Sequence, residues 1–300
     1  MLKCTVVLST YNGEKYIKEQ LESLFVQSRQ IDEVIISDDC SQDTTVDIIK
    51  NYISENKLFS WKLYQNEKNK GWKKNFKDLI LMAKNDVIFP CDQDDIWEKY
   101  KIEKMMRILE DNKEICFLAS DFEPLYEKGA RAVSHGNEGN YFLEQIPFDH
   151  NFGRIARPGC TMAFRKEFVD KIRNIWEDWY PHDSFLWTEA VLYKTGFIVH
   201  EKLIKYRRHE SNATLNMTHN KNTQISALKR IIAIGRHFLM VNTITETECK
   251  IVTDYIEFAR IRLKFLEEKA FFCWFKLVFK RKYYTSVKQL FGDWYYFIFQ

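Results

Sequence analysis

The sequence predicts an α/β fold in which helices flank a mostly parallel central sheet and a helical region follows at the C-terminal end. Short β-rich runs alternate with segments of helical periodicity through the first half of the chain. A helix between consecutive strands is typical of the right-handed crossovers of a parallel sheet. Polar clusters follow the strands, so we expect them to gather along one edge of the sheet.

The first half of the chain supplies four of the predicted strands. They lie at Thr5–Ser9, Glu33–Ser37, Trp61–Tyr64 and Asp86–Pro90. Helices are predicted between them, over about 14–27, from a cap at Ser41 or Asp43 to about Tyr52, and over about 73–83.

The second half is less regular. It predicts a helix over 98–111, strands at Ile115–Ser120 and Cys160–Phe164, and a mixture of strand and turn over Thr195–Tyr206. Residues 122–158 lack periodicity, which is typical of functional loops. The pattern is helical after about residue 221. We therefore expect a catalytic domain at 1–218 and a helical, basic and aromatic region at 219–300.

Composition limits the class of protein. With 300 residues and 45% apolar side chains, the chain can form one large domain with an appendage. Its seven cysteines are scattered and include no Cys-x-x-Cys pair, which indicates neither a zinc site nor a disulfide framework and favours the reducing cytoplasm. We expect no signal peptide and no membrane-spanning helix, because no sufficiently long apolar run occurs.

A buried strand ends in three carboxylates. The run Val87–Trp97 contains Asp92, Asp94 and Asp95 directly after its apolar residues. This much negative charge at a strand end is costly without a cation. Mg²⁺ or Mn²⁺ takes carboxylate oxygens and shares its other positions with phosphate, at the sheet edge where a nucleotide is expected. The plain alternative is a solvated acidic turn.

Six polar clusters occur in order along the chain. They are Ser9–Gly13, Asp38–Ser41, Asn69–Asn75, Asp92–Asp95, Tyr180–Asp183 and Tyr206–Asn212. This set resembles the inverting family-2 nucleotide-sugar glycosyltransferases, which have a Rossmann-like GT-A fold, and the resemblance covers about residues 3–212. The Asp-Gln-Asp-Asp-Ile-Trp run with a later His-Asp pair is most similar to their bacterial rhamnosyltransferase-like branch.

The resemblance implies a donor site for a UDP- or dTDP-linked sugar. Its expected residues are Thr10, Tyr11, Asn12, Asp38 and Asp39 at the base and ribose, Asn69, Gly71 and Asn75 in a loop over the nucleotide, and Arg208, or its neighbour Arg207, at the diphosphate. A carboxylate can accept hydrogen bonds from a pyrimidine N–H or from ribose hydroxyls. The alternative is that Asp38 and Asp39 only cap the next helix.

The resemblance also implies a metal centre that holds Mg²⁺ or Mn²⁺. Asp94 is expected to bind the ion directly, and Asp92 to bind ribose, the ion or its water. Asp95 would orient the sugar hydroxyls. His209 matches a segment that places a histidine on the metal in some relatives, and neutral imidazole suits Mn²⁺. A surface histidine in a basic loop is the alternative.

Asp183 matches the catalytic base of the family. Inversion is a single displacement at the anomeric carbon, so it needs one base for the proton of the acceptor hydroxyl and no enzyme nucleophile. Asp183 precedes an apolar helical run, and a helix N-cap is the alternative role. Its neighbour His182 would tune Asp183 or bind the acceptor.

The C-terminal region combines aromatic and basic residues, with 14 Lys and Arg against 7 Asp and Glu over 221–300. Such a region suits a membrane interface, and packing on the catalytic domain or on a second copy in a homo-oligomer is the alternative. No recognised motif supports nucleic-acid binding.

The sequence therefore predicts a metal-dependent inverting glycosyltransferase, cytoplasmic or peripheral at the inner face of the plasma membrane. Its acceptor would be a bacterial surface glycan or a lipid-linked acceptor. The alternatives are a nucleotidyltransferase and a non-catalytic scaffold subunit of a glycan-assembly complex.

Overall fold

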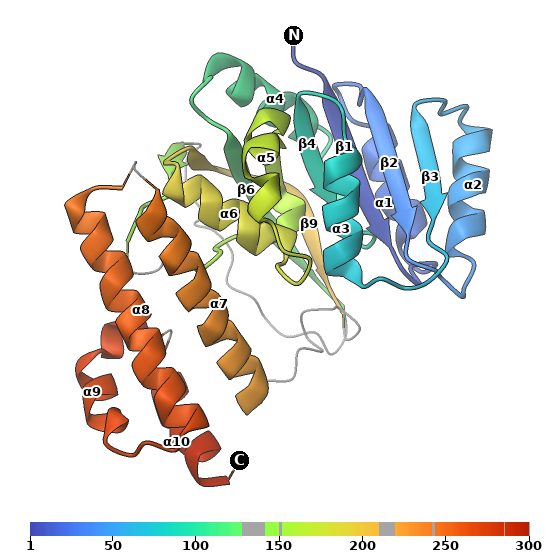
Figure 1. Ribbon diagram of the computed structural model, residues 1–300. Helices are drawn as coiled ribbons and strands as arrows, with labels where there is room; N and C mark the ends of the chain where they lie inside the picture. Colours follow the sequence, from blue (N-terminus) through green and yellow to red (C-terminus); the bar gives the residue numbers. More distant parts are fainter. Residues whose placement is uncertain (128–141, 150–151, 210–219, 242–243, 285, 300) are drawn as a thin grey trace. The chain divides into compact units, whose positions relative to one another are not determined.

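The computed structural model describes residues 1–127, 142–149, 152–209, 220–241, 244–284 and 286–299, and it confirms the predicted α/β fold (Figure 1). The chain forms two compact units. The first is Met1–Ile146 with Ile155–Glu210, and the second is Pro147–Arg154 with Ser211–Gln300. The expected boundary at 218/219 falls outside the described residues.

One mixed sheet forms the centre of the first unit. Its strands are β1 Cys4–Thr10, β2 Glu33–Asp38, β3 Trp61–Gln65, β4 Val87–Cys91, β5 Ile96–Trp97, β6 Phe117–Tyr126, β7 Leu143–Gln145, β8 Met162–Arg165 and β9 Gly196–Arg208. They follow the order β3-β2-β1-β4-β8-β6-β9-β5, and β7 pairs with β9. β1 to β4, β6 and β9 all run in one direction, because β8 is antiparallel to both β4 and β6. The carboxyl ends of six strands therefore meet at one edge.

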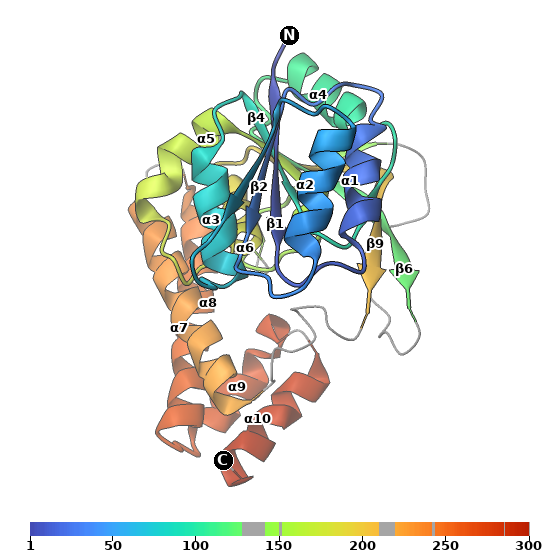
Figure 2. The ribbon, with the colours of Figure 1, turned by 90° about the vertical axis from the view of Figure 1, so that its right-hand side faces the viewer.

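Helices cover both faces of this sheet. They are α1 Ile17–Phe25, α2 Thr45–Glu55, α3 Trp72–Met82, α4 Lys101–Asp111, α5 Lys166–Ile172 and α6 His182–Leu192. Figure 1 shows α3, α5 and α6 on the near face, and Figure 2 shows α1 and α2 side by side on the other.

Strand alternation builds a separate core on each face of the sheet. Successive side chains of a strand point to opposite faces, so Val6 and Leu8 of β1 join one buried cluster together with residues of α1, α2 and α4. Val7 is equally buried but lies outside that cluster. The opposite orientation brings Ser9 and Ser37 within hydrogen-bond distance of Asn75 on α3. The sheet is therefore fixed from both sides just below its carboxyl edge.

Three expectations about the second half are corrected. β6 continues to Tyr126 into the segment expected to be irregular, because it pairs with β9 along its length. Thr195–Tyr206, expected to mix strand and turn, is largely the continuous strand β9. The two-residue strand β5 and the three-residue strand β7 are too short to produce a period-2 pattern, and both exist by pairing with β9.

The second unit is helical in its described part. Its elements are α7 Lys221–Met240, α8 Glu246–Glu267, α9 Cys273–Phe279, the short helix η3 Arg281–Tyr283 and α10 Val287–Phe299. Capping boxes at Asn220 and Thr245 begin α7 and α8. Gly235 allows close approach of these helices, because a Cβ there would lie 2.6 Å from Ile256. Among the described helices, none is long and apolar enough to cross a membrane.

Candidate active site

The loops after β1, β2, β4 and β9 meet at the carboxyl edge of the sheet. Their first residues are Tyr11, Asp39, Asp92 and His209. The parallel directions of these strands bring together clusters that are up to about 200 positions apart in sequence. The last part of the sixth predicted cluster, 210–212, lies outside the described residues.

The loop after β1 is held by a residue that the sequence did not single out. Gln93 accepts a hydrogen bond from the Tyr11 amide at 2.8 Å and donates one to the Tyr11 carbonyl at 3.1 Å. Gly13 leaves room for this side chain, because a Cβ there would lie 2.3 Å from Gln93 Oε1. The Tyr11 side chain remains 44% exposed above this backbone clamp. Gln93 thus ties the expected nucleotide loop to the acidic loop.

Asp38 is buried and connects the loops after β1 and β2. Its carboxylate accepts hydrogen bonds from the hydroxyls of Thr10 and Ser41 and from the Ser41 amide. Ser41 in turn accepts from the amide of Asn12, which has a φ of +46°. Asp38 does not cap the next helix, because α2 begins after an N-cap at Thr44. Its bonds shape the loop walls.

Asp39 organises the third loop. Its carboxylate accepts hydrogen bonds from the Asn66 side chain at 2.9 Å and from the amides of Lys70 and Gly71 at 2.8 Å each. Gly71 has a φ of +82°, a region that favours glycine, and its amide also donates to Asn69. This loop is therefore ordered by the protein itself.

Asn75 lies below that loop and is fully buried. Its amide group bonds Ser9, Ser37 and Asn66. The structure thus gives Asn75 a positioning role beneath the loop. Its side chain has no exposed atom that could make the expected contact with the nucleotide.

Negative charge is concentrated where β4 ends. A carboxylate oxygen of Asp92, one of Asp95 and the Cys160 sulfur lie within 4.8 Å of one another. Asp95 accepts a hydrogen bond from the Arg207 amide through one oxygen, while its other oxygen is buried and has no hydrogen-bond partner among the described residues. Burial and the neighbouring Asp94 charge raise the pKa of Asp95 to about 7. Burial, then Asp95 and Asp94, raise the pKa of Asp92 well above its ordinary range.

A buried cation lies beneath this acidic cluster. Lys101 of α4 is fully buried, donates to the Cys160 carbonyl at 2.5 Å and lies 3.7 Å from the ring centre of Trp97. Burial lowers its pKa to about 8, although the thiols of Cys160 and Cys91 and then the carboxylates oppose the shift. One lysine thus faces several carboxylates, so the cluster is short of positive charge.

The remaining acid of the motif pairs with the predicted histidine. His209 Nε2 lies 2.7 Å from Asp94 Oδ2, and the imidazole stacks on Tyr16 at 4.8 Å between ring centres. A carboxylate and an imidazole at this distance can bind one divalent ion. Among the described residues, however, the three donors that lie within 4.8 Å of one another are Asp92, Asp95 and Cys160, so the structure does not gather Asp94 and His209 into one set with Asp92. The carboxylates of Asp92 and Asp95 are ligands that suit Mg²⁺ or Mn²⁺.

The two arginines that end β9, Arg207 and Arg208, make different contacts. Arg207 is buried, donates to the Asp94 carbonyl at 2.7 Å and forms an ion pair with Glu19. It therefore holds the acidic loop in place. Arg208 is also buried and bonds the Tyr206 hydroxyl at 3.3 Å.

Asp183 lies in the first turn of α6, after an N-cap at Pro181 that has no side-chain hydrogen bond. Asp183 is half-buried and accepts from the neighbouring Ser184 amide at 2.6 Å. Its charge is near enough to Asp92 to contribute to the raised pKa of that carboxyl group, after burial and the other two acids. The structure thus brings the expected base and the expected metal ligands into one electrostatic neighbourhood.

A short backbone segment separates the base from the acids. A Cβ on Gly159 would lie 2.5 Å from His182 Nε2 and 3.3 Å from Asp183 Cβ, while the next residue, Cys160, faces the carboxylates. His182 itself is buried, packs on Phe76 at 4.2 Å and has no hydrogen bond from either ring nitrogen among the described residues.

Four residues important to this geometry were missed by sequence reasoning. They are Gln93, Lys101, Gly159 and Cys160. Gln93 could have been noticed because it interrupts the acidic run. Its hydrogen-bond partner, Tyr11, is 82 positions away, so no local sequence pattern indicated the contact.

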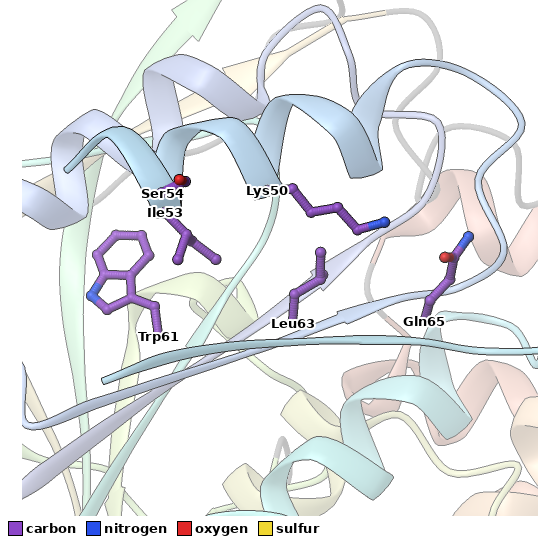
Figure 3. Close-up of a pocket in the computed structure, with 6 residues that line it drawn as sticks. All are labelled: Lys50, Ile53, Ser54, Trp61, Leu63 and Gln65. Carbon is purple, nitrogen blue, oxygen red and sulfur yellow. The ribbon is translucent and has the colours of Figure 1, made fainter. Parts of the chain in front are cut away.

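The cavity in Figure 3 lies elsewhere in the unit. It has a volume of about 330 Å³ and lies between α2 and β3, with Lys50, Ile53, Ser54, Trp61, Leu63 and Gln65 as lining residues. No predicted site residue lines it, and its chemistry offers no carboxylate. We therefore assign the candidate site from the converging loops.

Comparisons with known proteins agree on one family. The model of the family described as Glycosyl transferase family 2 matches residues 5–173. dTDP-rhamnosyl transferase RfbG of Shigella flexneri is 32% identical over 216 residues, which cover 68% of this chain and 72% of that protein.

Two solved structures share the fold. S. aureus TarS 1-349 in complex with UDP-GlcNAc has a TM-score of 0.69 at 19% identity, covering 88% of this chain and 73% of the TarS 1-349 chain. The mannosyltransferase PcManGT from Pyrobaculum calidifontis, in complex with GDP-Man and Mn²⁺, has a TM-score of 0.55 at 14% identity, covering 94% of this chain and 74% of that one.

Proposed function

Because the chain belongs to glycosyl transferase family 2, we propose that it moves one sugar from a nucleoside diphosphate donor to a hydroxyl group of a bacterial surface glycan. The predicted family, its rhamnosyltransferase-like branch and the GT-A fold are confirmed. Family membership also favours sugar transfer over the nucleotidyl transfer and scaffold alternatives.

The observation that carries the mechanism is the proximity of Asp183 to the acidic cluster. Asp183 would take the proton of the acceptor hydroxyl as that oxygen attacks the anomeric carbon, which inverts its configuration. Gly159 lets the backbone pack closely on the first turn of α6, because a Cβ there would lie 2.5 Å from His182 Nε2 and 3.3 Å from Asp183 Cβ.

We assign the divalent ion to Asp94, Asp92 and His209, with Asp95 orienting the sugar hydroxyls. When bound, Mg²⁺ or Mn²⁺ would stabilise the negative charge that develops on the leaving diphosphate. The short Asp94–His209 contact supports these two ligands, and the closeness of Asp92 to Asp95 and Cys160 supports a cation where β4 ends. PcManGT, whose complex contains Mn²⁺, supports the assignment.

The donor would lie across the loops after β1, β2 and β3. Tyr11 is an exposed aromatic side chain that would be available to the base, and Asn12, Asp38 and Asp39 are polar residues of the same loops. Asn69 and Gly71 would cover the nucleotide from the third loop, and Arg208 would face the diphosphate.

The similarity to RfbG supports a dTDP-linked sugar, and the TarS complex supports a UDP-linked one. We propose that the enzyme acts in the cytoplasm, where such donors would be used at the inner face of the plasma membrane on a lipid-linked glycan. A homo-oligomer and the expected lack of a nucleic-acid partner stay predictions.

Replacement of the base tests the proposal. Asp183→Asn should lower transfer from a dTDP- or UDP-sugar by about 10²–10⁴-fold while the donor still raises the melting temperature of the variant with Mn²⁺ present. Glu177→Gln, an exposed position in the loop that leads into α6, is the matched control and should transfer normally. Unchanged turnover of Asp183→Asn would exclude Asp183 as the base.

A further inference from the structure

The second unit leaves an unusual amount of apolar surface exposed. On α10, Val287, Phe291, Tyr295 and Ile298 are between 56% and 68% exposed, and their spacing of three or four residues places them on one stripe of the helix. Residues of the opposite stripe are buried or pack on α8, among them Leu290 and Asp293. α10 is therefore apolar on its outer side as well as on its inner side.

α9 continues this surface. Phe272, Phe275 and Phe279, which flank or belong to α9, are 82%, 55% and 89% exposed. Trp274 of α9 contacts both Phe291 and Trp294 of α10, with ring centres 6.3 Å and 5.0 Å apart, so the two helices are neighbours (Figure 2). The exposed aromatic side chains thus belong to one face, which we call the α9–α10 face.

Basic residues outnumber acids in the segment that carries this face, and Lys280 is paired with Glu257 of α8 at 2.7 Å. The chain between 269 and 299 contains six basic residues and one acid, Asp293. That acid is fully buried in an ion pair with Arg262, at 2.7 and 2.8 Å. Four of the basic residues are exposed around the aromatic side chains and have no acidic neighbour in the segment: Lys276, Arg281, Lys282 and Lys288.

Aromatic side chains with Lys and Arg residues around them suit contact with an anionic bilayer. Aromatic rings favour the boundary between head groups and acyl chains, and each Lys or Arg near an anionic bilayer adds attraction. A second copy of this chain fits less well, because it would place the same four cations against one another. Since none of the described helices is long and apolar enough to cross a bilayer, the contact expected of this face is with the bilayer surface.

We propose that the α9–α10 face docks on a bilayer that contains anionic lipid, with its aromatic side chains in the interface and its Lys and Arg residues at the head groups. This rests on the proposed function only for its biological purpose, which is to bring the enzyme to a lipid-linked acceptor. The binding itself needs neither donor nor metal.

Sedimentation of the full chain with vesicles tests the docking. Vesicles of phosphatidylcholine alone are compared with vesicles in which about a third of the lipid is phosphatidylglycerol. We expect binding to the anionic vesicles only, and a large decrease at about 0.5 M salt, where surface charges are screened. Equal binding to both kinds of vesicle, or to neither, would overturn the proposal.

Two sets of variants separate the aromatic and charged contributions. The aromatic set is Phe272→Ser, Phe279→Ser and Phe291→Ser, and the charge set is Lys276→Glu, Arg281→Glu, Lys282→Glu and Lys288→Glu. All seven side chains are exposed, so both combined variants should keep the thermal unfolding of the parent. Each should lose about tenfold or more in affinity for anionic vesicles.

The controls come from the first unit. Phe59→Ser removes an aromatic side chain that is 91% exposed there, and Lys113→Glu reverses an exposed charge. Neither should alter vesicle binding. Vesicle binding retained by the charge variant, or a dimer in solution that the aromatic variant abolishes, would contradict a lipid partner. Donor turnover without vesicles is measured in parallel, so failure of docking and failure of the enzymatic proposal give different results.

Discussion

Two groups of buried charge in this chain have opposite character. In the helical unit, Arg262 donates two hydrogen bonds to Asp293, and that carboxylate also accepts from Tyr284 at 2.7 Å. At the sheet edge, Asp92 and Asp95 lie together above the single cation Lys101, and one Asp95 oxygen has no partner among the described residues.

The comparison separates a structural charge from a functional one. A buried ion pair with every hydrogen bond made fixes α10 against α8 and requires nothing further. A carboxylate that stays buried without a partner costs stability, and a protein retains it where a ligand later supplies the missing charge. The raised pKa values of Asp92 and Asp95 express this shortage of positive charge.

Disruption of the satisfied pair should have the largest effect. Arg262→Met leaves Asp293 buried and unpaired, so we expect the free energy of unfolding to fall by about 3–5 kcal/mol. The double variant Arg262→Met with Asp293→Leu should recover most of that loss. Urea unfolding followed by tryptophan fluorescence measures both. A loss below about 1 kcal/mol in the single variant would remove the contrast between the two groups.

The same kind of change at the sheet edge should act in the opposite direction. Asp95→Asn removes one of several buried carboxylates that share the cation Lys101, so without metal at pH 8 the free energy of unfolding should rise by about 1–3 kcal/mol. Stabilisation by Mn²⁺ and sugar transfer should both decrease. The matched control is Asp38→Asn, where the carboxylate has three protein donors and the variant should be destabilised. Destabilisation of both variants would mean that Asp95 is satisfied in solution.

Gly159→Ala tests whether the close packing of residue 159 on the start of α6 is needed to position Asp183. The new Cβ would displace His182 or Asp183, and overpacking of this kind costs about 1–3 kcal/mol. We expect transfer activity to fall more than thermal stability. Gly153→Ala is the control, because a Cβ at that position would have no atom within 4 Å and its φ is not in the left-handed region. Equal activity of both variants would show that Gly159 is not required.

The raised pKa values of Asp92 and Asp95 determine how the stability of the metal-free protein changes with pH. The folded protein keeps protons on Asp92 and Asp95 at pH values where the unfolded chain, with an ordinary value of 3.8, has lost them. The stability of the metal-free protein should therefore be greatest below about pH 4 for these groups and decrease as the pH rises toward about 7. A divalent ion must displace these protons, so its affinity should rise by up to about tenfold per pH unit below pH 7.

Melting temperatures with and without Mn²⁺ at pH 6 and pH 8 measure this effect. The shift caused by Mn²⁺ should be larger at pH 8 in the parent. In Asp95→Asn it should depend less on pH, and an unchanged dependence would assign the titration to another group.

The sequence predicted those features that depend on strand direction. Alternation of strands and helices was enough to bring the ends of β1, β2 and β4 together, and thereby Asp39 and Asp92. Asp94 and His209 meet for the same reason, although 115 positions separate them, because β9 runs parallel to β4.

Other features depend on contacts that leave no periodic signal. Lys101 has the spacing of a helix residue and the chemistry of a surface lysine, and its burial follows from Trp97 and Cys160. Gly159 lies in an aperiodic stretch. A side chain at this position would be too close to His182 of α6, which the sequence pattern around residue 159 does not show. Sequence patterns report which face of an element is buried, but they do not report which distant side chain reaches it.

The hydrogen bonds that Asp39 makes would affect how fast the donor can bind. Asp39 fixes this loop through bonds within the protein, so if the proposed donor binds this shape, the loop loses little conformational freedom and needs no slow rearrangement. The slowest step of the proposed catalytic cycle would then be binding of the acceptor or release of the nucleoside diphosphate.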